Sequence, residues 1–572
     1  MKRLEMLVIA IWSGFIFGIL EGLVFNFTRQ FPALFAPYKL PAEVLWVSPI
    51  INIMVFSFTI LLLSSAIRAI APRVNMSHGL LTLGVGLFLG LFGVLNAPKV
   101  LHLLSTVLLA GGLTIVIVRV LRRHEQAVIH TSNRFLLIIP LSLILLALGV
   151  YGTKTIYESQ LYNDLPVAWE DSPNVLLIVM DTVRFDRFSI PTEPLLTPNL
   201  DDFANAGMRF TNAWPTTSWT LPSHASILTG YYPHQHGADW PELNLDPQTL
   251  TLGEYFRGRG YVTAAFSGNS SWVTPEYLGS GFMRFQVYIL ADLMRRTSYG
   301  RILNRVSEWF GYHYAGLGKK APQSNIEFLD FIDDYPDRPF FVLINYMDVN
   351  QAFYHEKLNR PFWEFPAPVE DQIAAYDEGL RQLDSQIGEL FQELSRRGTL
   401  SNMLIVITSD HGQSFGASAL HDHDPSGHGT SLYVEQLHVP LFIIYPEKIL
   451  AGSSNEALVS LHQLPATLAL LSGDKSNPFP GAALVGNPME IANPGVEQES
   501  EILASLNYGD SNIRSILWDQ YQYIKNILKI GTVEELFDLE SDPFAQNNIV
   551  KEFPSLESVR KSLQVLLGME ER

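Results

Sequence analysis

The sequence predicts a bundle of five transmembrane helices followed by an α/β domain with a small C-terminal subdomain. Three observations carry this prediction: long apolar runs crowd the first quarter, short buried strands then alternate with helical patterns, and short strand-like pieces dominate after residue 500. A chain of 572 residues is also too long for one ordinary core. The expected parts are a transmembrane domain at 1–152, a linker at 153–172, an α/β domain at 173–500 and the subdomain at 501–572.

The first quarter contains apolar runs at about 6–27, 44–67, 79–95, 100–118 and 135–151. Most approach the roughly 20 residues that cross a bilayer, although the third and fourth are short. A cleaved signal peptide would account for one run but not for five. In the first run Gly14, Gly18 and Gly22 recur on one helix face, which favours close packing on another helix. Glu21, near the end of this run, has two open interpretations: an interfacial position, or a contact with lipid or substrate.

The basic residues between the runs predict the orientation. The larger set, which we expect to face the cytoplasm, is Lys2, Arg3, Arg68, Arg73, Arg119, Arg122, Arg123 and Arg134. Five spans with the N-terminus inside place everything after about residue 152 outside the cytoplasm. We therefore expect an integral protein of the cytoplasmic membrane, with the lipid bilayer as a partner and an extracytoplasmic α/β domain. Because the chain has no cysteine, packing alone must stabilise this domain.

The charge is distributed unevenly along the chain. Residues 1–160 carry twelve Lys and Arg against five Asp and Glu, so the net charge of −18 leaves −25 for the remainder. Such an acidic domain is not expected to bind nucleic acid. An alternative explanation is that the acidic charge only keeps the domain soluble.

Buried strands and helical patterns alternate after residue 173. The run Asn174–Met180 has the length and β-branched content of a strand buried on both faces. Further strands are expected at 262–266, 340–346, 403–408 and 439–445, and helices near 199–207, 223–230, 249–258, 323–333 and 369–397. This alternation predicts a largely parallel sheet. Sites form at the carboxyl ends of such strands, where Asp181, Asp348 and Asp410 fall.

The segment Ser218–Gly230 offers a hydroxyl nucleophile, Thr220, just before a Pro-Ser turn that opens a helix. The helix N-terminus can hold a tetrahedral anion against the threonine oxygen. A neutral threonine is a poor nucleophile and needs a base or a metal. Asp181, Asp410 and His411 are candidate metal ligands that, with Thr220, form a mixed oxygen and nitrogen site for manganese, calcium, magnesium or zinc. Taken singly, each aspartate also fits a helix cap or a turn.

The order of these motifs resembles the sulfatase and alkaline phosphatase superfamily over roughly residues 172–550. The matching segments are Asn174–Arg184, 197–200, Ser218–Gly230, Thr408–Gly412, Gly427–Gly429 and Glu535–Pro543. The resemblance implies a sulfatase-like α/β fold, with Asp181, Asp410 and His411 as metal ligands and Thr220 at the nucleophile position. It also implies that His428 contacts the transferred group or its leaving oxygen. His428 fits a surface turn with His421 and His423 as well, a loop whose Asp422 and Asp424 could make a weak metal site.

Three residues depart from the family pattern. Thr182 stands where many sulfatases have a second aspartate, which predicts a smaller metal shell. His224, a candidate catalytic residue, stands where sulfatases carry an arginine that supports formylglycine. Asn350 replaces a histidine that helps bind the ester or a second metal, and His355 is a poorly spaced substitute.

Threonine cannot become the aldehyde hydrate that sulfatases form from cysteine or serine, so phosphoryl chemistry is favoured. The predicted function is a membrane-anchored, metal-dependent hydrolase or transferase acting on an anionic phosphate-type ester of an envelope lipid or glycan. Five spans before such a domain also resemble bacterial phosphoethanolamine transferases and lipoteichoic acid synthases, which usually have glutamate where this chain has Asp181. Two alternatives stay open: a sulfuric ester hydrolase, and a catalytically silent lipid-binding regulator.

Overall fold

The computed structural model divides the chain into two compact units. The first comprises Met1–Gln160 and Ile289–His313, and the second comprises Leu161–Tyr288 and Tyr314–Arg572. The structure describes residues 3–28, 41–70, 78–98, 100–169, 171–188, 196–309, 318–358, 367–416, 427–485, 501–508, 511–528, 531–553 and 561.

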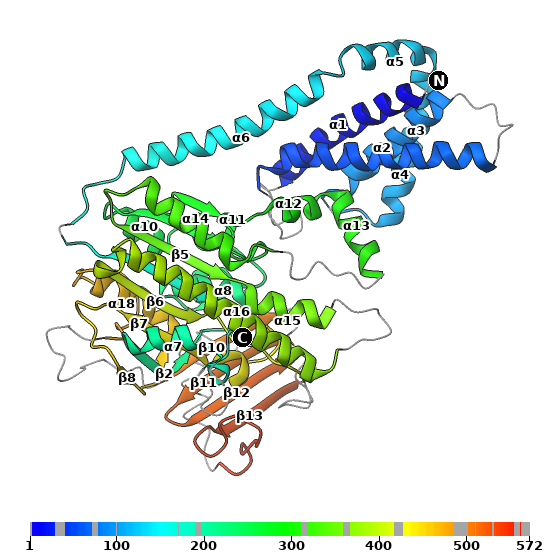
Figure 1. Ribbon diagram of the computed structural model, residues 1–572. Helices are drawn as coiled ribbons and strands as arrows, with labels where there is room; N and C mark the ends of the chain where they lie inside the picture. The colour runs from blue at the N-terminus through cyan, green and yellow to red at the C-terminus, as the bar shows by residue number, and fades with distance from the viewer. Residues whose placement is uncertain are drawn as a thin grey trace. The chain divides into compact units, whose positions relative to one another are not determined.

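The first unit is helical (Figure 1). Its helices are α1 (Arg3–Thr28), α2 (Val44–Ile70), α3 (His78–Asn96), α4 (Leu103–Leu121), α5 (Glu125–Arg134), α6 (Ile138–Asn163), α12 (Leu290–Arg296) and α13 (Ser298–Trp309). Among the described residues four helices, α1, α2, α4 and α6, are long and apolar enough to cross a membrane. The apolar part of α3, Leu81–Asn96, is shorter than these four helices. The expected number of five membrane-spanning helices is therefore not confirmed. The structure also differs from the expected linker at 153–172, since α6 continues to Asn163.

The glycine face of α1 packs against α2, as its spacing predicts. A Cβ atom on Gly18 would lie 2.3 Å from the Cα of Pro49, and one on Gly14 would lie 2.6 Å from the Cα of Ile53. Only glycine permits two helix backbones to approach this closely.

The second unit is built on a mixed sheet of nine strands, in the order β4-β3-β5-β1-β6-β7-β2-β8, with β9 paired to β2. The strands are β1 (Asn174–Met180), β2 (Met208–Trp214), β3 (Val262–Ser267), β4 (Arg284–Gln286), β5 (Phe340–Tyr346), β6 (Met403–Ser409), β7 (Val439–Ile444), β8 (Ser453–Asn455) and β9 (Val459–Ser460). From β4 to β6 all pairings are parallel, whereas β7 is antiparallel to both β6 and β2. The expected parallel sheet is thus present, with an antiparallel extension through β7 and β2.

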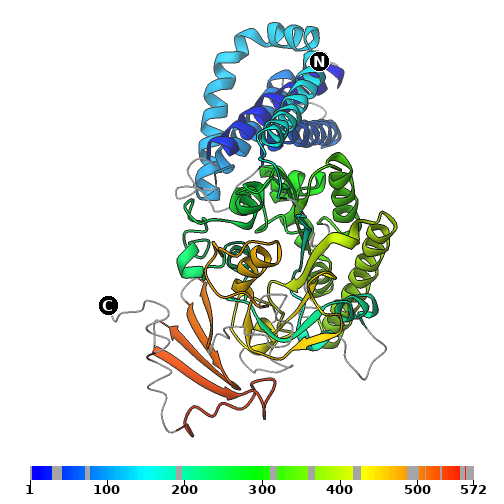
Figure 2. The same cartoon turned by 90° about the vertical axis from the view of Figure 1, so that its left-hand side faces the viewer.

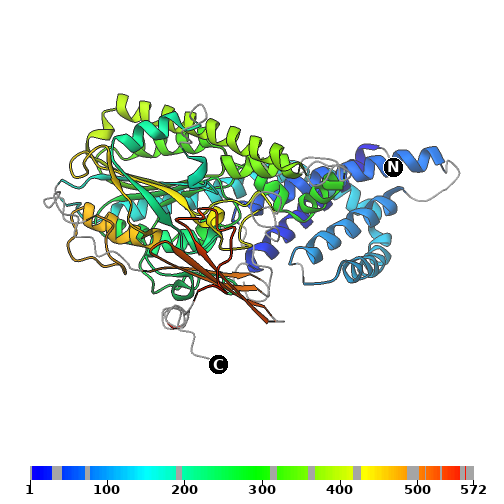
Figure 3. The same cartoon turned by 90° about the horizontal axis from the view of Figure 1, so that it is seen from below.

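Helices cover both faces of this sheet (Figure 3). Alternate residues of β1 enter two separate cores: Val175, Leu177 and Val179 face one, and the even-numbered neighbours face the other. This explains why the strand reads as one continuous apolar run. The helices of the unit are α7 (Pro198–Asn205), α8 (Thr220–Thr229), α9 (Pro233–His236), α10 (Leu252–Arg257), α11 (Pro275–Leu278), α14 (Ala321–Asp334), α15 (Asp348–Leu358), α16 (Val369–Arg396), α17 (Val434–Leu437) and α18 (Leu464–Leu471).

A separate antiparallel sheet follows near the C-terminus (Figure 2). Its four strands are β10 (Ile502–Tyr508), β11 (Ser511–Trp518), β12 (Tyr521–Leu528) and β13 (Gly531–Asp538). The amide of Ser505 donates to the Thr216 carbonyl at 2.8 Å, close to the start of α8. This contact joins the second sheet to the segment that carries Thr220.

Candidate active site

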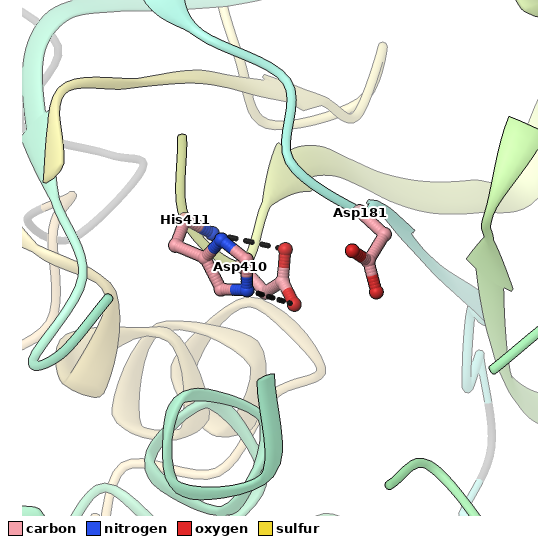
Figure 4. A group of neighbouring side chains, drawn as sticks. All are labelled: Asp181, Asp410 and His411. Atoms are coloured by element: carbon pink, nitrogen blue, oxygen red, sulfur yellow. Dashed lines mark hydrogen bonds and ion pairs between the residues drawn. The ribbon is translucent and has the colours of Figure 1, made fainter. Parts of the chain in front are cut away.

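Two aspartates meet because their strands are parallel neighbours in register. Met180 of β1 pairs with Ser409 of β6, so the next residues, Asp181 and Asp410, leave the sheet side by side. One ligand atom from each, together with one from His411, lies within 4.8 Å of the others (Figure 4). All three side chains are fully buried. The carboxyl end of the sheet thus gathers the three residues predicted as metal ligands.

The two carboxylate oxygens of Asp410 have different surroundings. Oδ1 accepts hydrogen bonds from the amides of Thr182, at 3.2 Å, and His411, at 2.9 Å. Oδ2 is buried and, among the described residues, has no hydrogen-bond partner. It lies 3.3 Å from Nε2 of His411. A buried carboxylate oxygen without a partner carries a large desolvation cost, which a bound cation would offset.

The imidazole of His411 is oriented by its own backbone neighbour. Its Nδ1 lies 2.9 Å from the Gly412 carbonyl, which can only accept, so the ring proton is on Nδ1. The lone pair of Nε2 then faces Asp410 Oδ2 and the hydroxyl of Thr220, whose Oγ1 is 3.1 Å away. Burial lowers the pKa of His411, so the ring is neutral. A metal-ligating imidazole needs this tautomer and this charge.

The side chains of two asparagines donate hydrogen bonds to the Asp181 carboxylate. Asn269, just after β3, donates to Oδ2 at 3.1 Å, and Asn350, in α15, donates to Oδ1 at 3.0 Å. Burial and the neighbouring charge of Asp410 raise the pKa of Asp181 to about 7, and burial raises that of Asp410. Sequence reasoning missed Asn269. Its position directly after a predicted parallel strand was the available signal, but polar residues are common at strand ends.

Thr220 is the first residue of α8, and its hydroxyl points into this cluster. Trp219 before it is extended, with φ −131° and ψ 137°, so the helix begins abruptly at the nucleophile candidate. The Ser223 hydroxyl donates to the Asp410 carbonyl at 2.6 Å, which ties the first turn of α8 to the end of β6. The first amides of a helix lack intrahelical acceptors and carry partial positive charge. The arrangement suits an anionic group placed against the Thr220 oxygen.

His224 lies one helical turn after Thr220 and is fully buried. Its Nδ1 is 2.9 Å from the Thr220 carbonyl, and its Nε2 is 3.3 Å from the Asn345 amide nitrogen. These partners place the proton on Nδ1 and let Nε2 accept. Burial lowers the pKa of His224 to about 3, so this residue cannot supply the positive charge of an arginine. Its contacts instead support the backbone that carries the Thr220 hydroxyl.

His428 lies beside His411, with the two ring centroids 4.4 Å apart. The flanking residues Gly427 and Gly429 have φ values of 141° and 66°, which side chains other than glycine rarely adopt. Nδ1 of His428 donates to the Gln413 side-chain oxygen at 2.9 Å. The ring is half-buried, whereas the other five predicted site residues are fully buried. The loop with His421, Asp422, His423 and Asp424 lies outside the described residues.

The departures from the family pattern have structural consequences. Thr182 adopts φ 67°, and its hydroxyl donates to the Asp181 carbonyl at 2.6 Å rather than offering a second carboxylate to the site. Asn350 contacts Asp181, whereas His355 is exposed on the same helix. Asp348 accepts from the first amide of α14, Ala321, at 3.1 Å, and so acts as a helix cap.

Comparison with known proteins gives a consistent result. The sequence model of the Sulfatase family matches residues 173–473, just over half of the chain. An ulvan-active sulfatase of Formosa agariphila is 25% identical over 433 residues, covering 69% of this chain and 80% of that protein. A choline-sulfatase of Rhizobium meliloti is 24% identical over 445 residues, covering 66% of this chain and 82% of that protein.

Solved structures share the fold at lower identity. The phosphonate monoester hydrolase of Agrobacterium radiobacter superposes with a TM-score of 0.52 at 20% identity, covering 69% of this chain and 94% of that chain. The phosphonate monoester hydrolase of Silicibacter pomeroyi gives a TM-score of 0.53 at 18% identity, with the same two coverages.

Proposed function

This chain belongs to the Sulfatase family of ester hydrolases, and on that premise we propose that it is a membrane-anchored, metal-dependent enzyme that cleaves or transfers a phosphate-type ester through Thr220. One observation carries the proposal. The unpaired Oδ2 of Asp410, the lone pair of His411 Nε2 and the Thr220 hydroxyl face the same small volume beside Asp181. This set of donors has the composition of a divalent-cation site that includes the nucleophile.

The residues that would hold the ion are Asp181, Asp410, His411 and Thr220. Carboxylate and hydroxyl oxygens with one imidazole suit manganese, calcium, magnesium or zinc. A bound divalent ion would polarise the ester and favour the alkoxide form of the threonine. The carboxamides of Asn269 and Asn350 orient Asp181 toward it.

The reaction divides into two displacements at phosphorus. The Thr220 oxygen, which has released its proton to water, attacks phosphorus, the bond to the leaving oxygen breaks, and His428, protonated on both ring nitrogens, gives that oxygen its Nε2 proton. The first amides of α8 stabilise the negative charge that develops on the transferred group. Water, or an acceptor alcohol, then attacks the phospho-threonine and regenerates the Thr220 hydroxyl. The first acceptor gives hydrolysis and the second gives transfer.

Sulfate ester hydrolysis is the second candidate, because relatives such as the ulvan-active sulfatase and the choline-sulfatase carry that name. It ranks second for a chemical reason. Formylglycine derives from cysteine or serine, and this chain has Thr220 at that position. A threonine sulfate ester would have to be released by direct attack of water, without the aldehyde hydrate that expels sulfate.

The four long apolar helices support anchoring in a lipid bilayer. We propose the cytoplasmic membrane, with α3 as a fifth span and the catalytic domain on the extracytoplasmic side, because five spans with the N-terminus inside leave most of the basic residues between the helices on the cytoplasmic side. The substrate would then be an anionic ester of an envelope lipid or glycan. Protease accessibility in right-side-out and inverted vesicles tests this orientation.

Mass spectrometry of trapped enzyme tests the chemistry. The full chain is incubated with manganese and nitrophenyl phosphate mono- or diesters, with nitrophenyl sulfate in parallel, and quenched in acid. We expect one phosphoryl group on the peptide that contains Thr220, and none after Thr220→Ala. Thr229→Ala is the matched control, because this hydroxyl lies in the same helix but donates to the Ala225 carbonyl. Unchanged turnover by Thr220→Ala would exclude the proposed nucleophile, and absence of divalent-ion binding would favour a silent binding protein.

A further inference from the structure

Residues 289–309 lie inside the range matched by the Sulfatase family, yet they pack within the helical first unit. The chain leaves the second unit after Tyr288 and returns to it at Tyr314. Both helices of the insert, α12 and α13, contact α2, and α13 also contacts α3. The segment is therefore a structural part of the apolar helix bundle.

Glu21 of α1 binds the start of α13. Its carboxylate is fully buried and accepts from the Ser298 amide and from the Asn52 side chain, each at 2.6 Å. A buried carboxylate is costly unless it is paired, and the N-terminus of a helix provides both a donor and a favourable dipole. The positive charge of Arg301, one turn further along α13, adds an attraction to Glu21. Glu21 thus holds the inserted segment against α1 and α2.

Further contacts fix α13 at one end of α3. The Ser298 hydroxyl donates to the Gly93 carbonyl at 3.0 Å, and the Tyr299 hydroxyl donates to the Leu89 carbonyl. A Cβ atom on Gly93 would lie 3.0 Å from the Tyr299 ring, so the glycine makes room for it. Arg301 donates to the Ala97 carbonyl at 3.4 Å. Ala97 lies just past the last apolar turn of α3, so α13 is located at the edge of the apolar zone.

The outer surface of the insert combines apolar side chains with positive charge. Leu290, Leu303 and Val306 are 54%, 55% and 42% exposed, and Arg305 is exposed beside the last two. The segment has four arginines against two acidic residues, whereas the chain after residue 160 carries a net charge of −25. An amphipathic helix of this composition at the edge of a bilayer binds the headgroup region.

We propose that residues 289–309 form a lipid-binding element, in which Leu303 and Val306 enter the acyl-chain boundary and Arg305 binds the phosphate of an anionic phospholipid. An anionic phospholipid is the expected ligand because of the position and charge of this surface. The surface lies at the end of the apolar helices and carries both apolar side chains and a cation. The proposal rests on the proposed membrane anchoring and is independent of the proposed phosphoryl chemistry.

Hydrogen–deuterium exchange of the full chain in nanodiscs tests this element. Discs of phosphatidylcholine alone are compared with discs containing phosphatidylglycerol. We expect the amides of 300–309 to exchange at least about fivefold more slowly in the anionic discs, because each arginine near an anionic surface gains about that factor. The Leu303→Ser and Arg305→Gln double variant should lose this difference. Lys475→Gln, which removes an exposed cation of the second unit, should keep it.

The Glu21→Gln variant tests the attachment of the segment separately. It should speed exchange at Ser298 to Leu303 in both kinds of disc and leave α4 unchanged, which also reports that the bundle is folded. Equal exchange of α13 in the two lipid compositions, or an anionic effect that survives the double variant, would overturn the proposal. Failure of the chain to incorporate into discs at all would instead refute the membrane anchoring.

Discussion

The Asp181→Asn variant separates two effects of the buried carboxyl pair. One is its electrostatic cost to the stability of the metal-free protein, and the other is its contribution to metal binding. Burial and repulsion from Asp410 raise the pKa of Asp181 from 3.8 to about 7 when no ion is bound. The folded protein then holds the proton more tightly than the unfolded chain does. The contribution of Asp181 to stability is therefore fully present below about pH 4 and is lost as the pH rises through 7. At pH 8 the cost is about 4 kcal/mol, at roughly 1.4 kcal/mol per pKa unit.

Asparagine removes the charge, but its NH2 group cannot accept a hydrogen bond. One of the two donors to this side chain, Asn269 or Asn350, therefore loses its acceptor. The lost hydrogen bond costs about 1–2 kcal/mol, so the metal-free variant should gain about 2–3 kcal/mol at pH 8. In a unit of roughly 400 residues each kcal/mol shifts the Tm by about 1 °C. We expect a Tm that is about 2–3 °C higher than that of the wild type at pH 8, and about 1 °C lower at pH 4, where Asp181 is protonated and only the lost hydrogen bond counts.

Metal should reverse this order. An ion at about 1,000 times its Kd stabilises the wild type by about 4.1 kcal/mol, which exceeds the variant's gain of about 2–3 kcal/mol, and it should not stabilise a variant that lacks one ligand. Scanning fluorimetry in EDTA, and then with manganese, calcium, magnesium or zinc, measures both effects. The reasoning is refuted if the metal-free variant melts no higher than the wild type at pH 8, or if both proteins gain equally from the ion.

Three further predictions concern single contacts. Asn350→Ala leaves Asp181 Oδ1 without its donor, and metal affinity measured by calorimetry should fall about 10- to 100-fold; an unchanged Kd would show that this carboxamide does not orient the ligand. His428→Asn should slow the cleavage of alkyl phosphate esters about 10²- to 10⁴-fold and that of nitrophenyl esters much less, because only the alkyl alcohol, a poor leaving group, needs a proton. Equal losses of rate on both esters would exclude the role of His428 as the acid. Gly18→Leu should lower the Tm in detergent, since its Cβ would lie 2.3 Å from Pro49 Cα, whereas Gly111→Leu, with no atom within 4 Å, should leave it unchanged.

Much of the site could be predicted from the sequence because the chemistry lies at the ends of strands. Buried runs of seven residues predicted β1 and β5 with the bounds that the structure shows. Parallel neighbours bring their carboxyl ends together, so Asp181, Asp410 and His411 could be grouped before any coordinates were known. The strand β2 was missed, because Met208–Trp214 has polar residues inside it and pairs antiparallel with β7.

The sequence by itself determined the division into apolar helices and an acidic α/β domain, since period and composition are local properties of the chain. Only the tertiary structure decided that Asn269 and Asn350 hold Asp181, and that Glu21 pairs with Ser298, 277 residues away. Polar residues after strands and amphipathic helices occur in many settings, and their partners depend on strand order and on how helices pack. A buried charge shows that a partner must exist, but only the folded backbone places that partner within hydrogen-bonding distance.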